Sequence, residues 1–280
     1  MTLESEISAG SLVKLSKMQI NKLVKTKEKI YFALSALIGI VLWGFLAFSI
    51  TIVYAQYSLN DSMSFLIISY FLLYLIFIAL ALLVVQAYFF GNSVLVKSHQ
   101  FPVVFGLVNE CAHALGMLNP PHVFIIHGRG LLNAFALKIF RTRYVILHAE
   151  VVDFALKRGQ HNELRFIISH ELAHHVVGHV SSWRFWLTLP ASITLFLPLA
   201  LSRAREYTCD SIAAAVLENS RNSASALLML AHGSQSLAND VNVEAFVEQE
   251  KMVPYLGGYI REIFQTHPRL TRRVQNVLRG

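Results

Sequence analysis

The stretch ISHELAHHVVGH, residues 168–179, places one carboxylate and four imidazoles in an otherwise apolar part of the chain. Apolar positions from residue 162 to 180 recur at helical spacing, which predicts that the stretch lies in the middle of a helix. Residues four apart on a helix lie about 40° from each other around its axis, so His170 and His174 project from one face. Two ring nitrogens can then reach one metal ion. His175 and His179 are predicted to point away from this pair and to be structural.

Glu171 lies next to the face that carries the two histidines, close enough to contact a water on the metal without being a ligand. In the pattern H-E-x-x-H, two imidazoles hold Zn²⁺ and the carboxylate takes a proton from the activated water. The competing interpretation is a set of ordinary histidines on a buried helix. It is disfavoured because burying Glu171 without a partner costs free energy, and an adjacent metal ion removes that cost.

A catalytic zinc needs a third protein ligand and an open position for water. Glu206, in SRAREYTCDS (202–211), is the best candidate and falls in a helix predicted over 203–218. Asp210 lies four residues on, hence on the same face, where it can accept the second N–H of a zinc-bound histidine. The sequence therefore predicts one zinc ion per chain, held by His170, His174 and Glu206.

The composition indicates a membrane protein, because 55% of the residues are hydrophobic and only 15% are charged. No charged residue occurs from Ile30 to Asn60 or between Asp61 and Lys97. Each run exceeds the roughly 20 apolar residues that cross a ~30 Å hydrocarbon core. Residues 30–95 are therefore predicted to form a transmembrane hairpin.

The distribution of basic residues predicts the orientation of this hairpin, since Lys and Arg are retained in the cytoplasm. Six lysines precede the first span and the loop 56–62 has no basic residue, so the basic N-terminus (1–29) and residues 96–280 are expected in the cytoplasm. The net charge of +7 is attributed to the membrane surface, with the lipid bilayer as a partner. No nucleic-acid partner is expected, and Cys111 and Cys209 are expected to be free thiols.

The remaining segments predict a small sheet among helices. Strands are expected at 122–126 and 144–148, with a third over 131–137, and the segment 240–258 is expected to be irregular. Further helices are predicted over four ranges: 100–118, 162–180, 203–218 and 222–237. A last short helix is expected to begin at Thr266-His267-Pro268.

The uncharged segment 185–202 separates the two predicted parts of the zinc site. As one helix it would extend about 27 Å, which is marginal for a crossing. A single crossing would keep Glu206 from meeting His170 and His174 at one ion. The segment is therefore expected to be re-entrant or to lie along the membrane surface, with Pro190 or Pro198 breaking the helix.

Four motifs in this order resemble the HtpX-type integral-membrane zinc peptidases, relatives of the CaaX prenyl endopeptidases and BepA-like peptidases. They are HELAHHVVGH (170–179), the Glu206-x-x-x-Asp210 pair, NAFAL (133–137) and THPRLTRRV (266–274). The resemblance implies an α+β, mainly helical fold in which the two-helix transmembrane hairpin precedes a zincin-like metallopeptidase domain with a small β-sheet. It also implies zinc on His170, His174 and Glu206, with Glu171 as general base.

The resemblance further suggests contacts with substrate. Asn133, Ala134 and Phe135 are similar to an edge strand that pairs with an extended substrate backbone, and an ordinary strand end is the alternative. His267 and Arg273 fall on the family's His-Pro and Arg positions, near the metal. They are expected to stabilise negative charge on the substrate carbonyl, and a helix N-cap histidine and a surface arginine are the equally open alternatives.

The sequence departs from the family pattern at LHAEVVD (147–153), so His148 and Glu150 inherit no role and are candidate cleft residues. The expected function is a membrane-bound zinc endopeptidase that acts on membrane or unfolded proteins, most simply in a bacterial inner membrane. A CaaX-type endopeptidase, a non-catalytic scaffold and a di-iron oxidase are the alternatives. The oxidase would use the E-x-x-H pairs Glu110/His113 and Glu171/His174.

Overall fold

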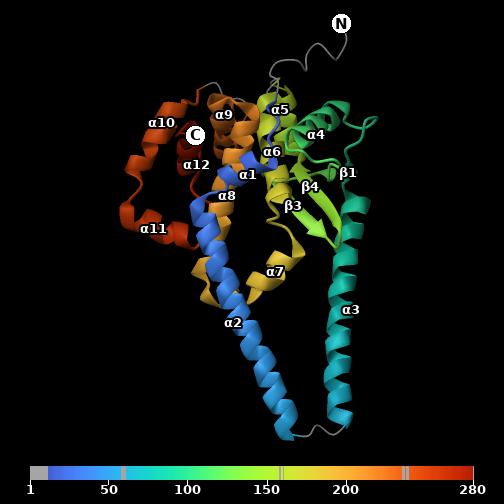
Figure 1. The fold of residues 1–280 in the computed structure, drawn as a ribbon. Coiled ribbons are helices and arrows are strands. Elements are labelled where there is room, and N and C mark those ends of the chain that lie inside the picture. The colour runs from blue at the N-terminus through green and yellow to red at the C-terminus, as the bar shows by residue number, and fades with distance from the viewer. Residues whose placement is uncertain are drawn as a thin grey trace.

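Two long helices, α2 (Thr26–Tyr57) and α3 (Asp61–Asn92), extend from one end of the molecule, and the other helices and the sheet lie at the opposite end (Figure 1). The computed structural model describes residues 12–57, 61–157, 159, 161–234, 237 and 240–279. The connection between the two helices, where the sequence predicts an outside loop, falls partly outside these residues.

Both helices can cross a bilayer by length and composition, over Thr26–Ile52 and Phe65–Asn92. Almost none of their apolar surface is covered by protein: 11% of the first apolar window is buried and none of the second. A helix that is apolar all round must be buried in protein or surrounded by lipid. Since protein does not cover these two, the predicted hairpin is confirmed and the chain is an integral membrane protein.

A helical body with a small sheet at one side lies at the other end of the hairpin (Figure 1). Its central element is α6 (His161–Val177), which packs against α4 (Pro102–Ala114), α8 (Phe196–Leu217), α9 (Ser220–His232) and the sheet. Leu164, Ile168 and Leu172 of α6 are fully buried in the core. The remaining helices are α1 (Lys17–Leu23), α5 (Ala149–Lys157), α7 (Ser182–Thr188), η1 (Leu189–Thr194), α10 (Val243–Glu248), η2 (Gln249–Met252), α11 (Tyr255–Ile263) and α12 (Leu270–Arg279).

The sheet has the order β1-β2-β4-β3, formed by β1 (Val94–Leu95), β2 (His122–Ile126), β4 (Thr142–His148) and β3 (Ala134–Ile139). β2 runs parallel to β4, and β3 pairs antiparallel with β4, with Ala134 opposite Leu147. The expected α+β, mainly helical fold with a small sheet is confirmed. Within the described residues β3 pairs with β4 alone, so its other edge is free.

Several predicted boundaries were wrong. The segment 240–258 is not irregular, because it holds α10, η2 and the start of α11. These helices are too short for apolar periodicity to reveal. α9 ends at His232 instead of residue 237 because Gly233, with φ 64°, caps it in the left-handed conformation. The last helix begins at Leu270, and α1, β1 and α5 were not predicted.

The uncharged segment 185–202 folds back along α2. It forms most of α7, then η1, and the chain turns at Leu195 (φ 51°) into α8. Trp43 Nε1 of α2 donates a hydrogen bond to the Trp186 carbonyl over 2.9 Å. Pro190 lies in the first turn of η1, and α8 begins before the predicted residue 203. The fold-back brings the end of α6 and the middle of α8 together.

Candidate metal centre and active-site cleft

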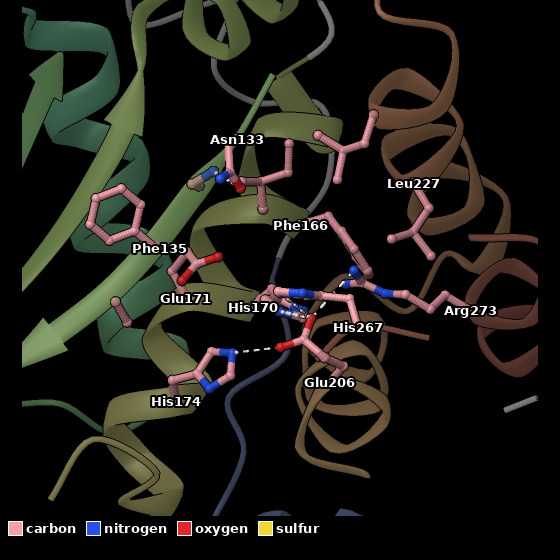
Figure 2. A pocket seen from close by; sticks show the side chains of 14 residues that line it. Asn133, Phe135, Phe166, His170, Glu171, His174, Glu206, Leu227, His267 and Arg273 are labelled. Carbon is pink, nitrogen blue, oxygen red and sulfur yellow. Dashed lines mark hydrogen bonds and ion pairs between the residues drawn. The ribbon is translucent and has the colours of Figure 1, made fainter. Parts of the chain in front are cut away.

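Helices α6 and α8 bring the three predicted zinc ligands together (Figure 2). His170 Nε2 lies 3.5 Å from Glu206 Oε2, and His174 Nε2 lies 3.6 Å from Glu206 Oε1. Ligand atoms on a tetrahedral zinc with bonds of about 2.0–2.1 Å are about 3.3 Å apart. Each histidine nitrogen thus faces a different oxygen of the Glu206 carboxylate, at a spacing close to that between two ligands of one zinc ion.

The charge of the cluster also suits a cation. Burial alone would raise the pKa of Glu206, but the hydrogen bond from His170 and the positive charge of Arg273 outweigh it, so the pKa lies well below its usual range. Burial would lower the pKa of His170, yet hydrogen bonds to Asp210 and Glu206 raise it to about 10. Asp210 and Glu206 thus stabilise a positive charge at His170. A metal ion can supply that charge in place of a proton.

Asp210 contacts His170 at Nδ1, the ring nitrogen that does not face Glu206, and Arg273 in turn contacts Asp210. His170 Nδ1 is 2.9 Å from Asp210 Oδ1, and Arg273 donates two hydrogen bonds of 2.7 and 2.8 Å to the same carboxylate. Arg273 Nη1 also lies 3.3 Å from Glu206 Oε2. Because Arg273 is only 7% exposed, the alternative of a surface arginine is wrong.

His267 lies at the mouth of the cleft. Its side chain is 65% exposed, and its Nε2 is 3.8 Å from Glu206 Oε2. It precedes α12, whose first residue is Leu270, by three positions. The helix N-cap alternative is therefore wrong, because that position belongs to Arg269.

Glu171 is buried between α6 and the sheet and faces the same cleft (Figure 2). Burial raises the pKa of its carboxyl to about 7, and a hydrogen bond from the backbone of Ala136 opposes this rise. The cleft is lined by residues from β3, α6, α8, α9 and the segment around α12: Asn133, Ala134, Phe135, Ala136, Phe166, Ile167, His170, Glu171, His174, Glu206, Leu227, Leu230, His267 and Arg273. Its wall thus includes the start of the free-edged strand β3.

His175 and His179 differ in their contacts. His175 points away from the metal ligands, and its Nε2 lies 2.9 Å from the Tyr144 carbonyl oxygen on β4. His179 Nδ1, by contrast, lies 3.0 Å from His174 Nδ1. The prediction that His179 points away was wrong, because α6 ends at Val177 and Gly178 (φ 84°) turns the chain back.

His179 also contacts a buried acid, Glu28, which the sequence analysis did not identify as part of the site. Its Nε2 lies 2.8 Å from Glu28 Oε1 on α2, and Thr208 Oγ1 donates to the other Glu28 oxygen over 2.5 Å. Burial lowers the pKa of His179, so its ring is neutral. A carboxylate only accepts, so Nε2 carries the proton of His179 and Nδ1 accepts one from His174. This tautomer leaves Nε2 of His174 free to bind a metal.

His148 and Glu150 do not line the cleft, contrary to the expectation. Glu150 accepts hydrogen bonds from Gly128 N (2.8 Å) and Gly130 N (2.9 Å), and His148 Nδ1 is 3.0 Å from the Leu131 oxygen. They hold the loop that leads into β3.

Cys209 offers another ligand set, since its sulfur and nitrogens of His170 and His174 lie within 4.8 Å of one another. Burial raises the pKa of this thiol well above its usual range, which disfavours the thiolate that binds metals. Cys209 is also absent from the residues that line the cleft. Glu206 is therefore the better third ligand. Cys111 and Cys209 are both free, as predicted.

The di-iron alternative is wrong. Glu110 accepts two 3.0 Å hydrogen bonds from Arg165, and neither Glu110 nor His113 lines the cleft that holds Glu171 and His174.

The sequence and fold define a class of protein. Residues 98–190 and 183–279 match peptidase family M48, and the chain belongs to this family. The resemblance to HtpX-type peptidases is thereby confirmed.

Particular relatives agree with this assignment. The chain is 29% identical over 194 residues to the plastoglobule-localized metallopeptidase 48 of Arabidopsis thaliana, covering 61% of this chain and 54% of that protein. It is 26% identical over 216 residues to a protease HtpX homolog of Helicobacter acinonychis, covering 63% of this chain and 66% of that one. The chain thus spans between about half and two thirds of these relatives' lengths. Among solved structures, Ste24p of S. mikatae matches with a TM-score of 0.46 and 16% identity, over 90% of this chain and 67% of that chain.

Proposed function

We propose that this chain is a membrane-bound zinc endopeptidase. The observation that carries the proposal is the spacing of His170 Nε2, His174 Nε2 and the Glu206 oxygens, at 3.5 and 3.6 Å, in a cleft shared with Glu171. Zinc, when bound by these three residues, would polarise the attacking water and the substrate carbonyl. One zinc ion per chain is expected.

Glu171 has the position and pKa of a general base. A carboxyl with a pKa of about 7 can take a proton from the attacking water at neutral pH and pass it to the leaving amine. His170 is held by Asp210, and His174 by His179, so both rings are oriented for binding the metal. Arg273 balances the charge of Asp210 and Glu206, and His267 at the mouth is placed to donate to the developing oxyanion.

The substrate would be an extended peptide. Asn133, Ala134 and Phe135 lie where the free edge of β3 meets the cleft, so their backbone can add a substrate strand to the sheet. A peptidase domain over 96–280 joined to the hairpin 30–95 suits exposed loops or unfolded stretches of membrane proteins. We place the domain and residues 1–29 in the cytoplasm, most simply at a bacterial inner membrane, on the charge distribution described above.

The test compares the purified full chain with Glu171→Gln on unfolded casein, with and without a metal chelator. We expect hydrolysis to fall by about 10²–10⁴-fold in the variant, as for loss of a general base. Both proteins should hold one zinc per chain by mass spectrometry, because Glu171 is not a ligand. Equal, chelator-insensitive hydrolysis by the two proteins would falsify the assignment.

A further inference from the structure

Helix α11 turns its apolar side chains away from the protein. At about 100° per residue, the apolar residues of α11 and its C-cap fall on one half of the helix circumference. They are Tyr255, Leu256, Tyr259, Ile260, Ile263 and Phe264. Tyr255 is 90% exposed, Leu256 66% and Tyr259 60%. A helix on a protein surface ordinarily turns its apolar face to the core, so this orientation is inverted.

The polar side of α11 fixes this orientation. Glu262 accepts a 2.8 Å hydrogen bond from Arg272 on α12, and Arg269 lies 3.3 Å from it. Gly258 is buried so tightly that an added Cβ would lie 2.5 Å from Arg269 Nη1. These contacts prevent the helix from rotating its apolar face inward.

The exposed face of α11 is continuous with the part of the molecule that meets lipid. The Phe264 ring lies 5.5 Å from that of Phe196, the first residue of α8. Phe196 follows η1, and η1 and α7 pack on α2 within its membrane-spanning range. Large apolar side chains of this connection are exposed too: Trp183, Phe185, Trp186, Ile193, Leu195 and Phe196. Figure 1 shows α11 drawn crosswise to α2, and α11 contacts α8.

We propose that α11 is an interfacial helix whose apolar face lies in the same bilayer that the hairpin crosses. An amphipathic helix of this kind buries its apolar face about 5–10 Å into the boundary between headgroups and acyl chains. Tyr and Trp favour that depth, and both occur on the surface formed by α7, η1 and α11. Exposed basic residues occur in the first turn of α2 (Lys27, Lys29), in η2 (Lys251) and on α11 (Arg261), and they suit the anionic headgroups of a membrane surface.

The docking of α11 places one wall of the cleft at the membrane. From the end of α11 the chain runs directly to His267, and Arg203 of α8 holds this segment by donating to the Ile263 (3.3 Å) and Gln265 (2.6 Å) carbonyl oxygens. The docking needs no peptidase activity, whereas its consequence for the cleft rests on the function proposed above. Substrate would then enter the cleft beside the lipid surface.

The test uses spin labels on the full chain in vesicles of phosphatidylethanolamine and phosphatidylglycerol. Leu256→Cys and Ile260→Cys place labels on the apolar face, and Glu244→Cys on α10 is the matched control on an exposed polar site. The two native cysteines are buried, so the unmodified chain measures the background. The far-UV circular dichroism and the thermal midpoint of each variant in detergent report whether it is folded.

Labels at 256 and 260 should collide more often with lipid-soluble oxygen than with a water-soluble nickel chelate, and the label at 244 should show the reverse. Equal exposure of all three labels to the nickel chelate would overturn the proposal. Short distances between labels at 256 on two chains, with no dependence on lipid, would also overturn it, because a second copy would then cover this face.

Discussion

At the scale of single residues, the proposed metal site depends on groups that set the proton positions of His170 and His174. Asp210 contacts Nδ1 of His170 over 2.9 Å, and His179 contacts Nδ1 of His174 over 3.0 Å. Each contact leaves Nε2 of the ring free toward Glu206. Partners of this kind raise metal affinity, because a histidine without a hydrogen-bond partner samples both tautomers and several ring orientations.

Replacing His179 should therefore weaken zinc binding. We expect His179→Ala to lower zinc affinity about 10–100-fold, the effect of losing a partner of a metal-ligating histidine. Competition with a fluorescent zinc chelator measures this affinity directly and needs no substrate.

His175→Ala is the matched control for that variant. His175 is a buried histidine near the end of α6, four positions before His179, but it contacts the Tyr144 carbonyl oxygen instead of His174. Its loss should reduce stability and leave zinc affinity nearly unchanged. Equal losses of affinity in the two variants would show that His179 acts through the fold alone.

At the scale of elements, the connection between α6 and α8 is held by a close approach of backbones. Gly39 of α2 faces the end of α7, where an added Cβ would lie 1.8 Å from the Leu187 oxygen. Gly44, on the same helix, has nothing within 4 Å of that position. The two glycines therefore differ in packing while sharing a helix and an apolar environment.

Gly39→Ala should separate α7 from α2, and Gly44→Ala should not. Overpacking of this kind costs about 1–3 kcal/mol. We expect a lower thermal midpoint in detergent for Gly39→Ala and a changed tryptophan emission, since Trp43 bonds to the Trp186 carbonyl. Matching midpoints for the two variants would contradict this contact.

The elements that precede α12 are joined to it by Glu250. This carboxylate accepts hydrogen bonds from Arg269, Thr271 and Arg272. Burial would raise its pKa, but these hydrogen bonds outweigh the burial and lower the pKa below the usual value. Such a group stabilises the fold above its unfolded pKa, and the contribution is lost as pH falls through its lower native pKa.

Glu250→Gln should thus lower the thermal midpoint at pH 7, and the difference from wild type should shrink below about pH 4. The exposed Glu248, 3.7 Å from Lys251, supplies the control Glu248→Gln, for which we expect little change at either pH. Thermal scans in detergent at both pH values measure the effect. A destabilisation of Glu250→Gln that persists undiminished in acid would contradict the ionic contribution.

At the scale of the whole molecule, the proposed metal centre requires an even number of membrane crossings between α6 and α8. The fold-back of α7 and η1 along α2 meets this requirement without two full spans. The start of α2, the end of α3 and the site residues on α6 and α8 should therefore lie on one side of the bilayer.

Thiol labelling in sealed vesicles tests this arrangement. Lys27→Cys, Arg141→Cys and Arg221→Cys, at three exposed positions of the body and the hairpin base, should react with an impermeant reagent from the same side. Ser58→Cys, in the connection between the spans, should react from the opposite side. Reaction of positions 141 and 221 from opposite sides would exclude the shared metal centre.

The sequence by itself determined the features that arise from local order along the chain. Continuous apolar runs predict the two spanning helices, and helical spacing places His170 with His174 and Glu206 with Asp210. β-branched and aromatic runs predict the strands at 122–126 and 144–148, and the third expected strand, over 131–137, overlaps β3. Each of these signals lies within a few turns of chain, so it can be read without knowing what packs against it.

Only the tertiary structure decided which distant groups complete the site. Glu28 reaches His179 across 151 positions, and Arg273 reaches Asp210 across 63. The reversal at Gly178, which turns His179 toward His174, ends a helix that apolar spacing alone would continue. The outward apolar face of α11 likewise follows from where Glu262 finds its partners. Such contacts depend on how the helices pack. Burying an unpaired charge costs free energy, so the stable packing is one in which each buried charge has a partner.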